Sequence, residues 1–287
     1  MIHETGRQWQ DAPARRVMLF GMSGLGKTHV ASMLRQSGQW FHYSVDYRIG
    51  TRYMGELIAD EFKRHAMQVP LLRELLLSDS VRIKSNITFD NLAPLSTYLG
   101  KPGDPELGGL RFEEYLQRQN QHRAAEVAAM MDSAQFIDRA TSIYGYPHFV
   151  CDTSGSICEV VDPDDPDDPV LNALDRLLLP VWIRGSDAHT AELVRRFDRA
   201  PKPMYYQREF LQNAWAEYRQ DHADPVDPDD FIRWAYARAL AHRQPRYEAM
   251  ARRGVTVCAD EIAAVASPED FVDLIADAID RKTQGHR

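Results

Sequence analysis

Five short apolar runs interrupt an otherwise mixed chain, and polar residues follow each of them. They cover residues 16–20, 40–45, 147–151, 180–183 and 255–258. Parallel strands that are covered on both faces appear in a sequence as continuous apolar runs, whereas half-exposed strands alternate apolar and polar positions. The five runs therefore predict the strands of one buried parallel sheet.

Apolar positions at helical spacing fill most of the intervals between these runs. The predicted helices cover residues 27–36, 171–178, 187–199, 207–220, 229–243 and 268–280. Strands that alternate with helices imply right-handed crossovers and a parallel sheet with helices on both faces. We therefore expect an α/β fold with a five-stranded parallel sheet flanked by helices.

Residues 53–140 break this alternation, because their pattern is helical and contains no strand. Apolar residues recur at helical spacing over residues 57–76, and residues 112–140 are rich in Ala, Glu, Gln and Arg. Residues 88–109 contain several Pro and Gly and predict a loop between these helices. The segment predicts a helical insertion after the second strand.

The insertion divides the remaining chain into two parts that together form the expected core. These parts are residues 1–52 and 141–287, and the first 15 residues predict only a polar lead-in. A chain of 287 residues can bury one large core or two modest ones.

Composition excludes several classes of protein. With 34 basic and 42 acidic side chains the formal net charge is −8, which argues against nonspecific nucleic-acid binding. No apolar run reaches the length of about 18 residues that suggests a membrane span, and the first residues lack the apolar core of a signal peptide. Cys151, Cys158 and Cys258 have no metal-like spacing and favour free thiols in a reducing compartment. We expect a cytoplasmic protein without a membrane or nucleic-acid partner.

The segment Gly21–Thr28 fits the phosphate-loop pattern G-x-x-x-x-G-K-[ST] without a mismatch. Glycines permit backbone torsions that turn consecutive N–H groups toward phosphate oxygens, and the following helix adds its positive N-terminal end. Lys27 would reach the β- and γ-phosphates, and the Thr28 hydroxyl would bind Mg²⁺. The pattern predicts ATP with Mg²⁺ at Gly21, Ser23, Gly24, Leu25, Gly26, Lys27, Thr28 and His29.

Polar residues that could take part in binding or catalysis follow the second, third and fourth predicted strands. They are Asp46-Tyr-Arg48 with Arg52, then Asp152-Thr-Ser-Gly-Ser156, and then Arg195, Arg196, Arg199 and Lys202. Together with the phosphate loop, this order resembles the small-molecule and nucleotide kinase branch of the P-loop NTPases, which includes shikimate, gluconate and nucleoside-monophosphate kinases. The resemblance covers about half of the chain, and only the phosphate loop is a specific motif.

The resemblance implies a P-loop NTPase fold and a role for several of these residues. Asp46 would be the general base or a carboxylate of the magnesium shell, and Arg48 and Arg52 would hold an anionic acceptor. Asp152 occupies the Walker B position, which holds Mg²⁺ directly or through water. The resemblance also places an acceptor-binding subdomain in the insertion.

In these kinases a helical lid follows the fourth strand, and here it would cover about residues 187–245. Lid arginines neutralise the charge that develops on the transferred phosphoryl group. Arg196 or Arg199 would have this catalytic role. A simpler interpretation is that the cations complement the negative C-terminal end of a helix.

Other interpretations stay open for the acidic residues and for the reaction. Asp46 and Asp152 could each cap a turn or helix, and Arg48 and Arg52 could be surface residues. The leading hypothesis is a kinase that uses Mg-ATP and a small-molecule or nucleotide-like acceptor. The alternative is an ATPase or nucleotide-dependent switch that acts through a protein partner. The lack of a second acid directly after Asp152 favours the kinase.

Overall fold

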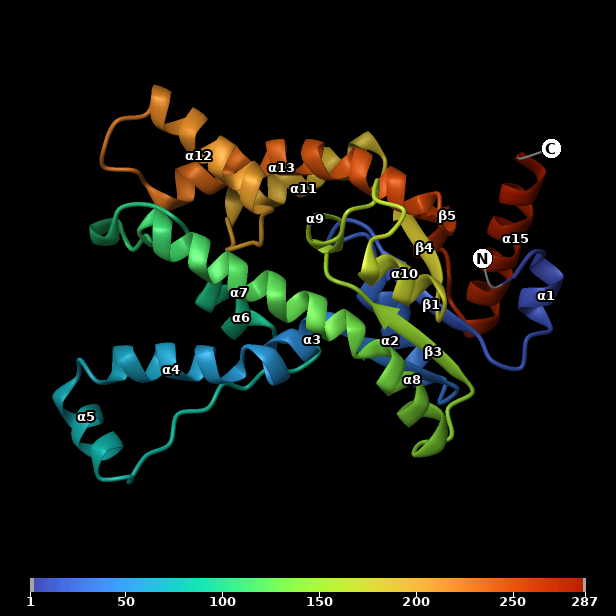
Figure 1. Ribbon diagram of the computed structural model, residues 1–287, viewed down its shortest axis with the longest axis horizontal. Helices are drawn as coiled ribbons and strands as arrows, with labels where there is room; N and C mark the ends of the chain where they lie inside the picture. Colours follow the sequence, from blue (N-terminus) through green and yellow to red (C-terminus); the bar gives the residue numbers. More distant parts are fainter. Residues whose placement is uncertain (1–2, 286–287) are drawn as a thin grey trace. The chain divides into compact units, whose positions relative to one another are not determined.

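The structure contains a five-stranded, wholly parallel sheet (Figure 1). The computed structural model describes residues 3–285. The strands are β1 (Arg16–Phe20), β2 (Trp40–Ser44), β3 (His148–Asp152), β4 (Leu179–Arg184) and β5 (Val255–Cys258). Their order is β2-β3-β1-β4-β5, and every neighbouring pair is parallel. All five predicted strands are confirmed, and each predicted end lies within one residue of the observed end.

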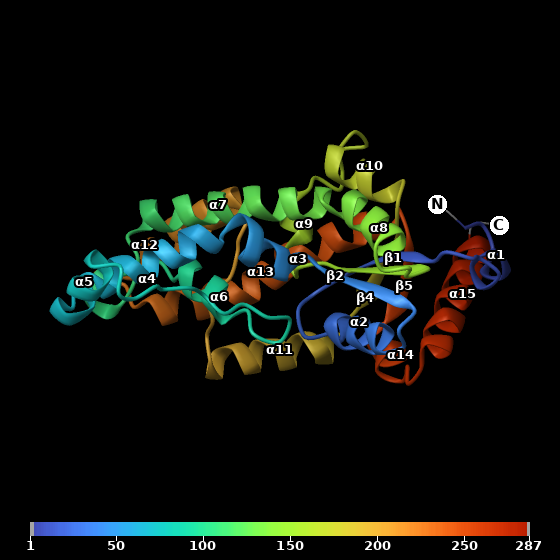
Figure 2. The same cartoon turned by 90° about the horizontal axis from the view of Figure 1, so that it is seen from below.

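Burial explains why the strands appeared as continuous apolar runs. In β1 the side chains from Val17 to Phe20 are at most 1% exposed, although successive side chains point to opposite faces. Both faces of the sheet are therefore covered. Figure 2 shows α2 (Lys27–Gln36) and α8 (Ser133–Ser142) on opposite faces of the sheet. The expectation of an α/β fold with helices on both faces is confirmed.

Further helices connect or follow the strands in the same part of the chain. They are α9 (Ile157–Val160), α10 (Pro169–Asp175), α11 (Asp187–Arg199), α14 (Ala259–Ala263) and α15 (Pro268–Gly285).

The N-terminal segment is more ordered than the predicted polar lead-in. It contains α1 (Gly6–Gln10), which packs against α15. Trp9 is fully buried, and its indole Nε1 donates a hydrogen bond of 2.9 Å to the carbonyl oxygen of Val272. A helix of five residues with one large apolar side chain has no period that a sequence pattern could detect.

The chain divides into two compact units. The first unit contains the sheet and consists of residues up to Val45, Met130–Ala200 and the residues from Ala235 onward. The second unit consists of Asp46–Ala129 and Pro201–Trp234. It therefore combines most of the predicted insertion with a stretch of the predicted lid region.

The second unit is helical. After α3 (Val45–Arg48) and a π-helical turn over Ile49–Tyr53, its helices are α4 (Gly55–Ala66), α5 (Pro70–Leu77), α6 (Ala93–Leu99), α7 (Phe112–Met131) and α12 (Arg208–Asp221). The prediction of a loop over residues 88–109 is wrong in part, because α6 and a 3₁₀ turn over Pro105–Leu107 lie within it. The apolar side chains of Leu95, Tyr98 and Leu99 drive α6 into the interior despite the flanking Pro and Gly.

Helix α13 (Pro228–Ala251) is longer than predicted and contains Pro245. Proline normally ends a helix near the preceding residue, so residue 243 was the expected end. Beyond the proline, however, Arg246 donates hydrogen bonds to the carbonyl oxygens of Cys158 (2.6 Å) and Val161 (2.9 Å). These tertiary contacts hold the last turns in place.

Among residues 3–285, no helix combines the length and the apolar character needed to cross a membrane. Helix α5 has no buried residue, and Leu71 and Leu77 are 65% and 73% exposed.

Candidate functional site

The loop between β1 and α2 is shaped by glycines. Gly24 and Gly26 have φ values of +87° and +94°, in the left-handed region that favours glycine. Gly21 also has a positive φ of +139°, and space is short there, because an added Cβ would lie 2.6 Å from the carbonyl oxygen of Ile183 in β4. The loop therefore needs glycine where the phosphate-loop pattern has it, and it leads directly into the N-terminus of α2.

Lys27 lies inside this loop. Its side chain is bent back, and Nζ donates hydrogen bonds to the carbonyl oxygens of Gly21 (2.7 Å) and Met22 (3.0 Å). The residue is only 6% exposed, so the protein holds an ammonium group in a largely buried position. A buried cation is costly unless polar groups surround it. The arrangement places a positive charge within the loop, close to the N-terminus of α2. The N-terminus of a helix also favours anions.

The other predicted nucleotide contacts lie around the same loop. Ser23, Gly24, Thr28 and His29 are exposed, whereas Leu25 is buried. An added Cβ on Gly155 would lie 2.3 Å from Ser23 Oγ. The turn after β3 therefore meets the phosphate loop without room for another side chain.

Asp152 is the last residue of β3. Its register partner is Leu19 in β1, the strand that leads into the loop. The residue is 5% exposed, and within residues 3–285 no group donates a hydrogen bond to its buried Oδ1. Its Oδ2 lies 3.5 Å from Nε2 of His42. A buried carboxylate oxygen without a donor is costly, and oxygen is the ligand that Mg²⁺ prefers.

The available oxygen ligands fit a magnesium ion that is held mainly by phosphate and water. The Thr28 hydroxyl lies in the first turn of α2, and Asp152 supplies a carboxylate from β3. Among the residues that the structure describes, no group of three or more His, Cys, Asp or Glu side chains could form a metal cage. Mg²⁺ commonly binds through one or two protein oxygens together with substrate phosphates.

Sequence reasoning missed His42, which lies in β2 and faces Asp152. Its side chain is fully buried. The only sequence signal is a histidine inside an apolar strand, two residues before that strand ends. A lone buried histidine is not specific enough to predict a partner on another strand.

Sequence reasoning also missed the contacts that fix the segment after Asp152. Glu159 accepts a hydrogen bond of 2.7 Å from Arg243 in α13, and both side chains are buried. Burial by itself lowers the pKa of Arg243, but the charge and hydrogen bond of Glu159, together with Tyr247 and Cys158, outweigh burial and raise that pKa. Tyr247, one helical turn further on, donates a hydrogen bond to the carbonyl oxygen of Gly155. Helix α13 thus holds the turn that meets Ser23.

The predicted lid arginines lie on α11, in the same unit as the loop. This helix begins with a capping box between Ser186 and His189. Arg195 and Arg196 both pair with Glu192, with 2.7 Å between Arg196 Nε and Glu192 Oε1. Arg196 and Arg199 are exposed. Their catalytic role stays a prediction.

Asp46, Arg48 and Arg52 belong to the second unit. Asp46 and Arg48 are half-buried in α3, and the Arg48 guanidinium lies 5.6 Å from the centre of the Tyr53 ring. Arg52 is exposed in the π-helical turn. Their roles as base and acceptor clamps also stay predictions.

No protein-family model matches the chain, and no solved structure matches it. The chain is similar to an isoleucine–tRNA ligase of Erwinia tasmaniensis, with 26% identity over 190 residues. The match covers 60% of this chain but only 20% of the ligase, so the chain spans about a fifth of that protein's length. A match of this extent assigns no family.

Proposed function

We propose that this chain binds Mg-ATP at Gly21–Thr28 and transfers the γ-phosphate to a small acceptor. The main support is the geometry of the loop, in which positive-φ glycines shape the backbone and the carbonyl oxygens of Gly21 and Met22 accept from the buried Lys27 ammonium at the start of α2. The proposal includes a P-loop NTPase fold. In open α/β sheets, ligands bind at the carboxyl ends of strands where the strand order changes direction. Here β1 is the central strand, and the loop follows its carboxyl end.

In this proposal the loop N–H groups and the end of α2 hold the phosphates. Lys27 exchanges the carbonyl oxygens of Gly21 and Met22 for phosphate oxygens. Thr28 and Asp152 would hold the magnesium ion, which neutralises phosphate charge when bound.

The proposed transfer step is a displacement at the γ-phosphorus. The acceptor hydroxyl oxygen forms a bond to the γ-phosphorus, the bond from that phosphorus to the β,γ-bridging oxygen breaks, and ADP leaves. Asp46 accepts the hydroxyl proton, while Arg196 or Arg199 balances the charge on the transferred group. Arg48 and Arg52 hold an anionic part of the acceptor.

The surroundings of Asp152 favour a kinase over an ATPase or switch. The next residue, Thr153, carries a hydroxyl rather than a carboxylate, and both its N–H and its hydroxyl donate to the carbonyl oxygen of Leu19. The next carboxylate along the chain, Glu159, is engaged by Arg243. Neither residue supplies the free base beside Asp152 that hydrolysis would use.

A phosphate-transfer screen with γ-labelled ATP over metabolite and nucleoside pools tests the reaction. We expect a labelled organic product, and we expect Lys27→Ala to abolish its formation while Lys84→Ala, a change at an exposed lysine, has no effect. Asp46→Asn should retain nucleotide binding but lose transfer. Release of free phosphate alone across the pools would instead support the ATPase, and normal transfer by Asp46→Asn would refute the assignment of the base.

A further inference from the structure

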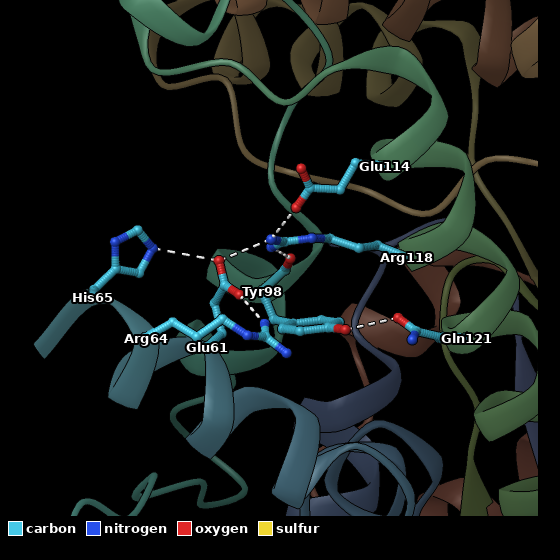
Figure 3. Close-up of polar contacts among 7 residues, drawn as sticks. All are labelled: Glu61, Arg64, His65, Tyr98, Glu114, Arg118 and Gln121. Atoms are coloured by element: carbon cyan, nitrogen blue, oxygen red, sulfur yellow. Dashed lines mark hydrogen bonds and ion pairs between the residues drawn. The ribbon is translucent and has the colours of Figure 1, made fainter. Parts of the chain in front are cut away.

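The second unit contains a pocket with a volume of about 630 Å³ between α4, α6 and α7. Small-molecule sites usually measure about 300–1,000 Å³. Its lining includes Glu61 and Arg64 from α4, Tyr98 from α6, and Glu114, Arg118 and Gln121 from α7 (Figure 3). None of these residues belongs to the proposed nucleotide site, so the pocket is a separate candidate binding site.

Arg118 is the structural anchor of the pocket. Its side chain is 8% exposed and donates hydrogen bonds to Glu61 Oε1 (2.8 Å), Glu114 Oε1 (2.6 Å) and the carbonyl oxygen of Tyr98 (2.6 Å). The guanidinium also lies over the Tyr98 ring, 4.8 Å from its centre. Burial by itself lowers the pKa of Arg118, but hydrogen bonds and charge from the two glutamates outweigh it and raise that pKa. The anchor is therefore a fixed cation.

The charges in the pocket balance one another. Glu61 pairs with both Arg118 and Arg64, and these bonds lower its pKa although burial alone would raise it. Two glutamates thus face two arginines, with His65 Nε2 3.3 Å from Glu61. A phosphate or another dianion would meet no surplus of positive charge, because each arginine is already paired. The pocket therefore suits a ligand without strong net charge.

Hydrogen-bonding capacity remains on the pocket wall. Glu114 accepts one bond at Oε1, and its side chain is 48% exposed. Gln121 accepts a hydrogen bond of 2.7 Å from the Tyr98 hydroxyl through Oε1, which leaves the amide nitrogen as a donor. Within residues 3–285, no group occupies Glu114 Oε2 or Gln121 Nε2. Gln117 adds a third polar side chain from the same helix.

We propose that this pocket binds a small, uncharged, polyhydroxylated molecule of the sugar or cyclitol class. Neighbouring hydroxyl groups can donate to the Glu114 carboxylate and accept from the Gln121 and Gln117 amides. The paired arginines fix the wall without attracting a phosphate. This inference concerns the second unit alone and is independent of the reaction proposed for the phosphate loop.

Ligand-observed NMR on the full chain, followed by calorimetry, tests the pocket. The neutral probes are myo-inositol, D-glucose and D-galactose, and the phosphorylated probes are inositol 1-phosphate and glucose 6-phosphate. We expect the neutral probes to bind and the phosphorylated ones to bind about tenfold more weakly or not at all. No binding by any neutral probe at millimolar concentration would overturn the proposal, as would tighter binding of a phosphorylated probe.

Two variants locate any binding that is found. Glu114→Ala combined with Gln121→Ala should weaken binding by about tenfold or more, because both open hydrogen-bonding groups are lost. Asn120 lies on an exposed part of the same helix outside the pocket, so Asn120→Ala should bind the probe as the unmodified chain does. Thermal unfolding checks that both variants fold. Equal binding by folded double and control variants would show that the probe binds elsewhere and would overturn the assignment.

Discussion

Arg243 in α13 donates a hydrogen bond of 2.7 Å to Glu159, which lies 84 residues earlier in α9, and water reaches almost none of either side chain. Breaking a buried pair leaves one charge without compensation, which typically costs about 3–5 kcal/mol. Arg243→Met should therefore lower the free energy of unfolding by about this amount in urea denaturation.

Two control variants distinguish the cost of an uncompensated buried charge from the cost of losing the packing of a side chain. Arg196→Met removes an arginine from an exposed pair with Glu192 and should cost at most about 1 kcal/mol. Combining Arg243→Met with Glu159→Leu removes both charges and should recover most of the lost stability. A double variant as unstable as Arg243→Met would show that packing, rather than the orphaned charge, explains the loss.

Asp152 has a buried carboxylate oxygen that no donor in residues 3–285 contacts. Without Mg²⁺, Asp152→Asn should leave stability unchanged or raise it by about 1 kcal/mol, because it removes a poorly compensated buried charge. With Mg²⁺ and ATP, the unmodified chain should gain thermal stability, and the variant should gain much less. Thermal unfolding with and without both ligands measures the two effects. Equal stabilisation of both proteins by Mg-ATP would exclude Asp152 from the metal site.

The cysteines should differ sharply in reactivity. Burial raises the pKa of Cys151 and of Cys158 to about 12, while Cys258 is half-buried. Alkylation requires the thiolate, which the two buried residues rarely form at pH values near neutrality. Iodoacetamide at mildly alkaline pH should label Cys258 in the folded protein and all three residues in urea, as mass spectrometry can show. Rapid labelling of Cys151 without denaturant would mean that the reagent reaches β3 in the folded protein.

The sheet was predictable from sequence because its strands are buried on both faces. From Val17 to Phe20 every position is apolar and buried, and such an unbroken apolar run is typical of a strand that is covered on both faces. The glycines of the loop over residues 21–28 were predictable for a related reason, since they satisfy local backbone and space requirements that their spacing records.

Contacts between distant segments left no such record. Trp9 is a single apolar residue in a polar segment, and its partner Val272 is 263 positions away. Glu159 and Arg243 each look like ordinary surface charges in sequence, although both are buried. Helix α13 passes Pro245 because of contacts made by Arg246, which local propensity cannot anticipate. The second unit shows the same limit, because its pocket depends on α4, α6 and α7 together.

Gly155 is the position where the turn after β3 touches the phosphate loop. A Cβ there would lie 2.3 Å from Ser23 Oγ, which must rotate away, and 3.1 Å from the backbone Ser23 N, so the turn or the loop must also give by a few tenths of an ångström. Because Tyr247 holds Gly155 from the other side, we expect the loop to move. Gly155→Ala should weaken ATP binding, measured by calorimetry, while thermal stability without nucleotide changes little.

A double variant tests this cause directly. Ser23→Gly removes the hydroxyl that the new methyl group would meet, so combining it with Gly155→Ala should restore much of the affinity that Gly155→Ala loses. Residues in contact show such non-additive effects, typically about 0.5–3 kcal/mol, whereas distant residues add independently. Thr190→Gly, a change at a half-buried residue of α11, is the control and should not rescue Gly155→Ala. Strictly additive losses in the Ser23 and Gly155 pair would mean that the turn does not set the position of the phosphate loop.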